Sequence, residues 1–317
     1  MSFADRETLH AISLLCHDCN RASRKYLWKR VTIPVPIPFS GPPDVTGLDL
    51  IVRDDNRSRW LRELTVHVIQ RYSGAMVVID AIMRVLSIAG HLRSLHFDMR
   101  AYLSDMATAM CAAPSFPFEL DSFGFPVEGT RHFIPFMLSQ PSIRHLHLRG
   151  PYNIDRIPDL PLSLLPNLDS LTASPIYAFR ITRGRAVQTL DVSGVPLSSI
   201  YTLYATSGIS ASTKPLLRLK IYLKAGISFL EQFTRVATHL RYLEISCRTE
   251  FLEETPHLSW LEELEWRGLP PGPPDIRRKP RWVASVRVCL QACPTLKRVI
   301  INGILITEPS TGRLTNP

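Results

Sequence analysis

Residues 141–148 read PSIRHLHL, and this short stretch contains the pattern that decides the fold. Three apolar residues, Ile143, Leu146 and Leu148, are spaced as apolar-x-x-apolar-x-apolar. The last two alternate with polar residues, as a short strand requires when one face is buried and the other is wet. The pattern therefore predicts a strand with an apolar side and a polar side.

The same pattern occurs ten times along the chain. The intervals between successive first apolar residues are uneven, but they average about 26 residues, within the period of leucine-rich repeats. A chance origin would not place a helix-sized interval after so many strands. The ten sets are Leu61, Leu64 and Val66; Leu92, Leu95 and Phe97; Leu120, Phe123 and Phe125; Ile143, Leu146 and Leu148; Leu168, Leu171 and Ala173; Val187, Leu190 and Val192; Leu216, Leu219 and Ile221; Leu240, Leu243 and Ile245; Leu261, Leu264 and Trp266; and Leu296, Val299 and Ile301.

Helical periodicity occurs in the intervals between these strands. In residues 75–89, Ile82 and Leu86 lie on one face of an amphipathic helix, and residues 227–239 and 281–293 are patterned in the same way. An ordinary doubly wound sheet would also alternate strands and helices. However, the chain has no glycine-rich strand-to-helix turn of the dinucleotide or phosphate-loop type.

We therefore expect an α/β fold in the form of an irregular leucine-rich-repeat solenoid. It would be a horseshoe with parallel strands on its concave face and helices on its convex face. The solenoid is predicted for residues 59–306, after a short helical segment at 1–33 and a proline-rich connection at 34–58. Residues 307–317 are predicted to form a disordered tail.

The polar residues that alternate with the apolar strand positions are the candidate binding residues, because they would all face the concave side. Their mixed charge, with several tyrosines and histidines, favours a protein partner over a phosphate backbone, which would require one sign of charge. Neither a nucleic acid nor a membrane is expected as a partner. The candidates are His96, Asp98, His145, His147, Arg149, Asp191, Arg218, Lys220, Tyr222, Tyr242, Glu244, Glu263 and Glu265.

The N-terminal segment has a different pattern. Residues 5–33 read DRETLHAISLLCHDCNRASRKYLWKRVTI. This segment resembles the second half of the F-box in fungal F-box and leucine-rich-repeat proteins, where a motif like SLVCRSW is followed, after a small linker, by LWRSVTI. The matching residues are Ser13, Leu14, Leu15 and Cys16, then Tyr26, Leu27, Trp28, Lys29, Arg30, Val31, Thr32 and Ile33.

The resemblance implies a role in ubiquitin transfer. In that family the F-box helices dock on the Skp adaptor of a cullin-RING ligase, and the repeats present a client protein. The chain would then be the substrate-recognition subunit of an SCF-type ligase. The Leu-Pro-containing first helix of an F-box has no counterpart here, so the alternative is a stand-alone leucine-rich-repeat protein that has lost ligase recruitment. The implied adaptor-binding residues are Leu14, Leu15, Cys16, Tyr26, Leu27, Trp28 and Val31.

The composition suits a soluble cytoplasmic or nuclear protein. With 45% hydrophobic and 21% charged residues, the chain can bury a large core. It shows no N-terminal signal, and no apolar run approaches the roughly 18 residues that a bilayer requires. Six irregularly spaced cysteines favour reduced thiols over a disulfide framework. The net charge of +9 is only a weak hint of an acidic partner.

We expect no enzyme activity, cofactor or metal. No Ser-His-Asp order, catalytic carboxylate pair or nucleophile elbow stands out. His145 and His147 share one side of a strand, but zinc requires three or four protein ligands. Cys289 and Cys293 are expected to pack as small apolar residues. The basic run at residues 277–281 is either a solvated loop or a nuclear-import signal.

Overall fold

The computed structural model describes about two thirds of the chain, which divides into two compact units, Met1–Leu165 and Pro166–Pro317. In each unit parallel strands form an open sheet, and neighbouring strands in the sheet are consecutive in the sequence. The predicted α/β class is therefore confirmed, and the strand order is consistent with a solenoid-like fold. The described residues are 23–35, 43–68, 75–99, 102–113, 115–150, 160–197, 206–223, 236–247, 260–267, 293, 295–301 and 304–307.

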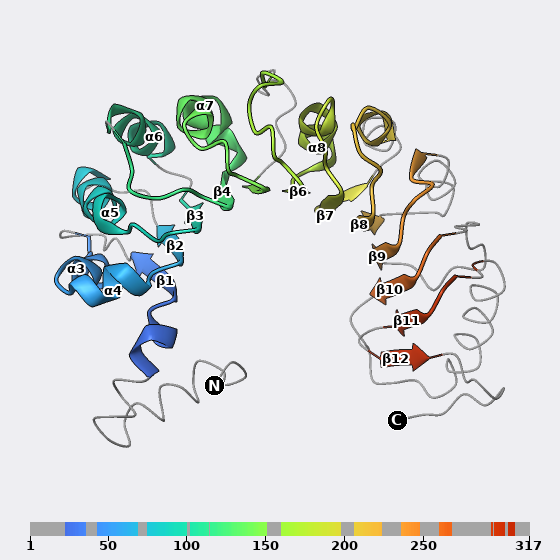
Figure 1. The fold of residues 1–317 in the computed structure, drawn as a ribbon, viewed down its shortest axis with the longest axis horizontal. Helices are drawn as coiled ribbons and strands as arrows, with labels where there is room; N and C mark the ends of the chain where they lie inside the picture. The colour runs from blue at the N-terminus through green and yellow to red at the C-terminus, as the bar shows by residue number, and fades with distance from the viewer. Residues whose placement is uncertain are drawn as a thin grey trace. The chain divides into compact units, whose positions relative to one another are not determined.

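The first unit contains five strands, each parallel to the next. Helices connect them, and in Figure 1 these helices lie along one side of the strands. The strands are β1 (Arg30–Val35), β2 (Glu63–Val68), β3 (Ser94–Asp98), β4 (Ser122–Pro126) and β5 (His145–Arg149). The helices are α3 (Thr46–Val52), α4 (Asp55–Trp60), α5 (Ala75–Ile88), α6 (Leu103–Ala112), the short 3-10 helix η1 (Val127–Gly129) and α7 (Thr130–Leu138).

The repeated apolar positions form the core of this unit. Pairing places Val31 beside Leu64, Leu64 beside Leu95, and so on through Phe123 to Leu146. All five side chains are buried. Each apolar position therefore stacks on its equivalent in the next strand, which is why one short pattern can specify the whole sheet.

Aromatic packing holds helix α7 against the middle strands. The ring of Phe133 in α7 lies 4.8 Å from that of Phe125 and 5.5 Å from that of Phe123, measured between ring centroids. Phe136, one helical turn further on, lies 5.1 Å from Phe123. All four rings are buried. Because large rings remove much apolar surface from water, this cluster is a major source of stability in the first unit.

The second unit continues the same pattern with shorter described connections. Its strands pair in chain order, and all are parallel except β12, which is antiparallel to β11. They are β6 (Ser170–Thr172), β7 (Thr189–Leu197), β8 (Arg218–Leu223), β9 (Tyr242–Cys247), β10 (Glu263–Arg267), β11 (Arg298–Ile301) and β12 (Ile304–Thr307). Helix α8 (Pro175–Thr182) follows β6.

Strand β1 is an addition to the ten predicted strands. It lies within the segment that the sequence assigned to the F-box-like region and its proline-rich continuation. Its signal is nevertheless present, because Trp28, Val31 and Ile33 have the same apolar-x-x-apolar-x-apolar spacing. Pro34 is tolerated within β1 because this is the first strand of the sheet, where a missing N–H group need not face a partner strand.

The helix predictions agree with the structure where it describes them. The helix expected at residues 75–89 is α5. Most of residues 227–239 and nearly all of residues 281–293 lie outside the described residues. Helices α3 and α4 occupy much of the stretch that the sequence suggested was a connection. Both are too short for a clear helical period, which explains why they were missed.

Candidate functional site

The polar face of the first unit is built from the strand residues that alternate with the buried ones. Pairing places Thr65 beside His96, His96 beside Gly124, and Gly124 beside His147. His67 lies beside Asp98 in the same way. The side chains of His67, His96, Asp98 and His147 are all partly exposed. Adjacent strands thus bring together polar groups that are about thirty residues apart in the sequence.

His96 lies over Gly124, where a side chain would not fit. A Cβ atom at position 124 would collide with Nδ1 of the His96 ring. Nε2 of His96 lies 2.9 Å from the Ser94 hydroxyl and 3.4 Å from the Ser122 hydroxyl. Nδ1 is buried and has no hydrogen-bond partner. Gly124 therefore creates the space in which the imidazole is held.

The surroundings of His96 keep its ring uncharged near neutral pH. Burial is the main cause that lowers the pKa of His96 to about 4, and the positive charges of His147 and Arg149 contribute to this shift. The His147 ring lies 5.1 Å away and is inclined at 61°. His96 thus acts as a neutral hydrogen-bonding group at pH 7, not as a cation.

Asp98 connects the outer charges of this face. Its carboxylate lies 2.8 Å from Nδ1 of His67 and 3.9 Å from the guanidinium of Arg149. The side chains of all three residues remain between 37% and 58% exposed. Since water screens exposed ion pairs, these contacts add little stability and leave the groups able to exchange partners.

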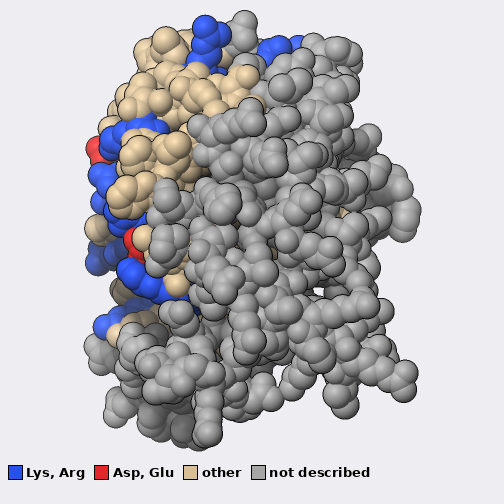
Figure 2. Space-filling view, turned by 90° about the vertical axis from the view of Figure 1, so that its right-hand side faces the viewer, with Lys and Arg blue, Asp and Glu red and all other residues tan. Residues whose placement is uncertain are grey.

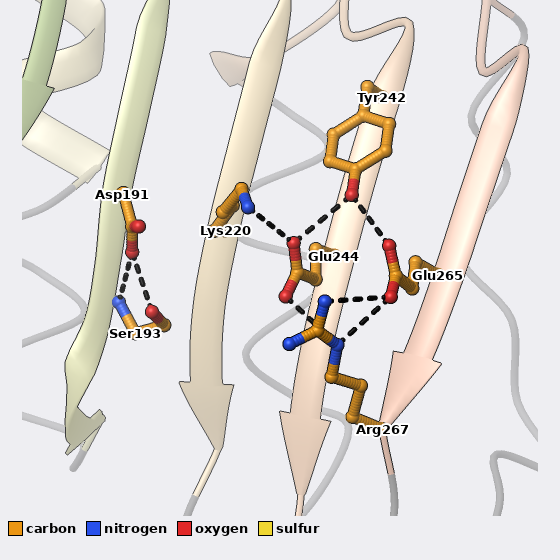
Figure 3. Close-up of polar contacts among 7 residues, drawn as sticks. All are labelled: Asp191, Ser193, Lys220, Tyr242, Glu244, Glu265 and Arg267. Carbon is orange, nitrogen blue, oxygen red and sulfur yellow. Dashed lines mark hydrogen bonds and ion pairs between the residues drawn. The ribbon is translucent and has the colours of Figure 1, made fainter. Parts of the chain in front are cut away.

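The polar face of the second unit contains a tighter network, which Figure 3 shows. Glu244 of β9 lies between Lys220 of β8, at 2.8 Å, and Arg267 at the end of β10, at 3.2 Å. Arg267 also contacts Glu265 at 2.9 Å. The Glu244 side chain is only 6% exposed. A carboxylate so far from water requires such cations, because an uncompensated buried charge is very costly.

Tyr242 joins the two carboxylates of this network. Its hydroxyl lies 3.0 Å from Glu244 and 2.8 Å from Glu265, and its single proton can be donated to only one of them at a time. Burial raises the pKa of Tyr242, and the hydrogen bond to Glu265 and the charge of Glu244 raise it further. Burial also acts to raise the pKa of Glu265, but hydrogen bonds from Tyr242 and Arg267 outweigh it and hold that pKa below its ordinary value.

The other predicted residues of the second unit surround this network. The guanidinium of Arg218 lies 4.5 Å above the Tyr242 ring, a cation–π contact. Asp191 accepts hydrogen bonds from the backbone N–H and the hydroxyl of Ser193. Glu263 lies 3.7 Å from Arg298. Tyr222 is partly exposed on β8, beside Ser246 of the next strand.

The thirteen predicted surface residues therefore fall into two groups, one on each unit. His96, Asp98, His145, His147 and Arg149 lie on β3 and β5 of the first unit. The remaining eight lie on β7 to β10 of the second unit. Gly124 could not be identified from the sequence, because a glycine among alternating residues carries no polar signal. The one available signal was that position 124 has no side chain, whereas the equivalent positions of the neighbouring strands are His96 and His147.

The F-box-like residues are described only in part. Leu14, Leu15 and Cys16 lie outside the described residues. Tyr26 and Leu27 lie in a helical stretch at residues 23–27, immediately before β1, and Tyr26 is 36% exposed.

Two other residues of this set contact the body of the first unit. The guanidinium of Arg57 in α4 lies 4.5 Å above the Trp28 ring. Asp54 holds Arg57 in place through a 3.1 Å ion pair. Val31 belongs to the buried row of β1 and is 7% exposed. Trp28 and Val31 thus help to attach the helical stretch to the sheet.

Basic side chains are more prominent than acidic ones on the described part of one face of the molecule (Figure 2). On the face of the molecule drawn in Figure 2, the described Lys and Arg side chains gather along one side of the view, with few acidic side chains among them. The basic run at residues 277–281 lies outside the described residues.

Within the described part of the chain, no group of three or more His, Cys, Asp and Glu side chains is placed to hold a metal ion. Cys293 is buried, and Cys289 lies outside the described residues. No helix in the described ranges is both long enough and apolar enough to cross a membrane.

Comparison with known proteins does not assign the chain to a family. No protein-family model matches the sequence, and no curated protein matches it significantly.

Proposed function

We propose that this chain is a leucine-rich-repeat protein that binds a client protein on the polar face of its strands and serves as the substrate-recognition subunit of an SCF-type ubiquitin ligase. In this proposal the strands line the concave face of a horseshoe and the helices cover its convex face. The observation that carries it is the half-exposed polar face that is repeated from strand to strand over a fully buried apolar face.

The leucine-rich-repeat assignment is supported by the register of the strands. In the first unit Arg30, Glu63, Ser94, Ser122 and His145 occupy equivalent positions on consecutive strands. A parallel sheet whose strands each come from one repeat, with a helix-sized interval between them, is the arrangement that such repeats produce.

The chemistry of the polar face supports a protein client. The face presents histidine, tyrosine, arginine and carboxylate groups of both charges, and protein interfaces are enriched in tyrosine and arginine. Nucleic acid would be disfavoured by Asp98, Glu244 and Glu265, since carboxylates repel phosphates. Among these groups, exposed Arg149 and Arg218 are the best candidates for direct contacts, because Glu244 is already saturated by its neighbours.

The ligase role rests on the F-box-like residues. Tyr26 and Leu27 precede the first strand directly, so an adaptor bound to them would be held close to the first repeat. Tyr26 is 36% exposed, and the Lys25 ammonium lies 5.0 Å from the centroid of its ring. Such a ring can be buried by a partner without rearrangement of the sheet.

Co-purification with a recombinant Skp adaptor tests this role. We expect wild-type protein to bind the adaptor and Tyr26→Asp to abolish binding, because the substitution places a charge in the apolar contact. Leu138→Asp is the matched control, since Leu138 is a half-exposed apolar residue on α7, far from the F-box-like segment in sequence. Circular dichroism would verify that both variants are folded. Absence of adaptor binding by the wild type would contradict the ligase role.

A stand-alone binding protein is the second candidate. It is favoured by the engagement of Trp28 and Val31 within the first unit, since residues that pack on Arg57 or in the sheet core are less available to an adaptor. The adaptor experiment separates the two candidates, because a stand-alone protein would keep its client while failing to bind the adaptor.

A further inference from the structure

A row of basic side chains runs along one edge of the first unit. The residue immediately before each of the five strands is Lys29, Arg62, Arg93, Asp121 or Arg144. The Lys29 carbonyl accepts hydrogen bonds from the N–H groups of Arg62 and Glu63, and the Arg62 carbonyl accepts from those of Arg93 and Ser94. The same double bond pattern recurs from Arg93 to Asp121 and from Asp121 to Arg144. The five residues are thus held in register.

This register fixes the spacing of the side chains. Parallel strands lie about 4.8 Å apart, so the row from Lys29 to Arg144 extends about 19 Å. Four of its five positions are basic, and we call these four, Lys29, Arg62, Arg93 and Arg144, the basic row. Lys29, Arg93 and Arg144 are exposed and Arg62 is partly exposed. The length of the row is close to that of a six-residue extended peptide, at about 3.3 Å per residue.

The charges of the basic row are not neutralised within the described structure. No residue of the row forms an ion pair with any residue of the described ranges. Arg62 donates instead to the backbone carbonyls of Arg59 and Leu61, and Arg93 donates to that of Glu119. Such bonds orient a guanidinium but leave its full positive charge in place.

The corresponding edge of the second unit is different. There the residues immediately before β9, β10 and β11 are Arg241, Glu262 and Lys297. Glu262 lies 3.7 Å from Arg241 and 3.1 Å from Lys297, so one carboxylate is shared by two cations. Basic residues at this repeat position can therefore be paired within the fold, and those of the basic row are left unpaired.

We propose that the basic row is a docking site for an extended acidic segment of a protein partner. Guanidinium groups bind carboxylates with two parallel hydrogen bonds, and an extended chain presents side chains along a line, as the row does. A nucleic acid fits less well, because its backbone carries a charge at every nucleotide and would place a phosphate against Asp121, which interrupts the row, whereas a peptide can place an uncharged residue there. The basic row contains none of the residues predicted to bind the client or the adaptor, so it can be tested independently of the ligase proposal.

The test compares two charge-matched variants of the full-length chain. Arg93→Gln with Arg144→Gln removes two cations from the basic row, and Arg241→Gln with Lys297→Gln removes two paired cations from the same repeat position of the second unit. Fluorescence anisotropy at physiological ionic strength would measure the binding of labelled decaglutamate, with decalysine and decathymidylate as comparison probes. Circular dichroism would check the fold of each variant.

We expect decaglutamate to bind the wild type and the second variant equally, and the first variant about tenfold more weakly, as the loss of two exposed charge contacts implies. Lys29→Gln alone should weaken binding by about threefold. Absence of decaglutamate binding, or equal weakening in both double variants, would overturn the proposal. Tighter binding of decathymidylate than of decaglutamate would assign the row to nucleic acid instead and overturn the choice of an acidic peptide.

Discussion

At the scale of single residues, the clearest constraint on the polar face is the fit of His96 over Gly124. The imidazole is partly buried, uncharged near neutral pH and held by Ser94, and it occupies the space that any side chain at position 124 would need. His147 of the next strand lies against it. This contact links three neighbouring strands through their polar side chains, in addition to their buried apolar ones.

The first prediction concerns this contact. Gly124→Ala should lower the free energy of unfolding by about 1 to 3 kcal/mol, because the new methyl group forces the His96 ring out of its site. In a His96→Ala background Gly124→Ala should lower the free energy of unfolding much less, since there is no imidazole ring to displace. Urea unfolding of the wild type, the two single variants and the double variant measures the difference. An equal loss of unfolding free energy on Gly124→Ala in both backgrounds would show that the His96 ring does not restrict the size of the side chain at position 124.

Residue by residue, the sequence predicted the positions on the polar face better than their roles. The alternation identifies His96, Asp98, Lys220 and Glu244 as polar strand residues because strand geometry depends only on local spacing. It does not reveal that Glu244 is almost buried, since that depends on Lys220 and Arg267, which come from other strands. Contacts between repeats are the part of the site that a single sequence leaves unspecified.

At the scale of elements, strands β8 to β10 are joined by a polar network as well as by their backbone pairing. Glu244 on the central strand is held by cations from both neighbours. Removal of one cation leaves the nearly buried Glu244 carboxylate with only one positively charged partner to balance its charge. The network should therefore contribute to the stability of this part of the sheet, unlike the exposed ion pairs elsewhere on the same face.

The second prediction compares two such pairs. Lys220→Met should lower the free energy of unfolding by about 1 to 3 kcal/mol, because Glu244 loses a partner that water cannot readily replace. Arg298→Met is the control, since it breaks the 3.7 Å contact with Glu263, in which both side chains are more than 40% exposed. It should change stability by less than about 0.5 kcal/mol. Thermal or urea unfolding measures the two effects. Equal losses of unfolding free energy in the two variants would contradict the inference that burial of Glu244 makes its ion pair more stabilising.

Elements with a long or repeated pattern were predicted, and short or atypical ones were not. The ten patterned strands and helix α5 follow from periodicity. Strand β1 was assigned to another segment although Trp28, Val31 and Ile33 have the repeat spacing, because the F-box resemblance covers the same residues. Strand β12 was missed because it lacks the repeat pattern and pairs antiparallel with β11.

At the scale of the whole molecule, the proposed function needs a polar surface that is repeated on both units. The first unit offers His67, Asp98 and Arg149 as partly or fully exposed polar groups that can exchange partners. The second offers Arg218 and Tyr222 beside a network that is already satisfied. A client would therefore be contacted mainly by these exposed side chains. The ion-paired network around Glu244 would hold the neighbouring side chains of the second unit in place.

We propose that the client protein binds the polar strand face and not the helical side. Quantitative mass spectrometry of co-purified proteins tests this with two charge-matched variants. Arg149→Glu with Arg218→Glu alters exposed residues of the strand face, and Arg53→Glu with Arg131→Glu alters exposed residues at the end of α3 and on α7. We expect specific partners of the wild type to be lost from the first variant and kept by the second. Retention of all partners by the first variant, or their loss only from the second, would contradict it.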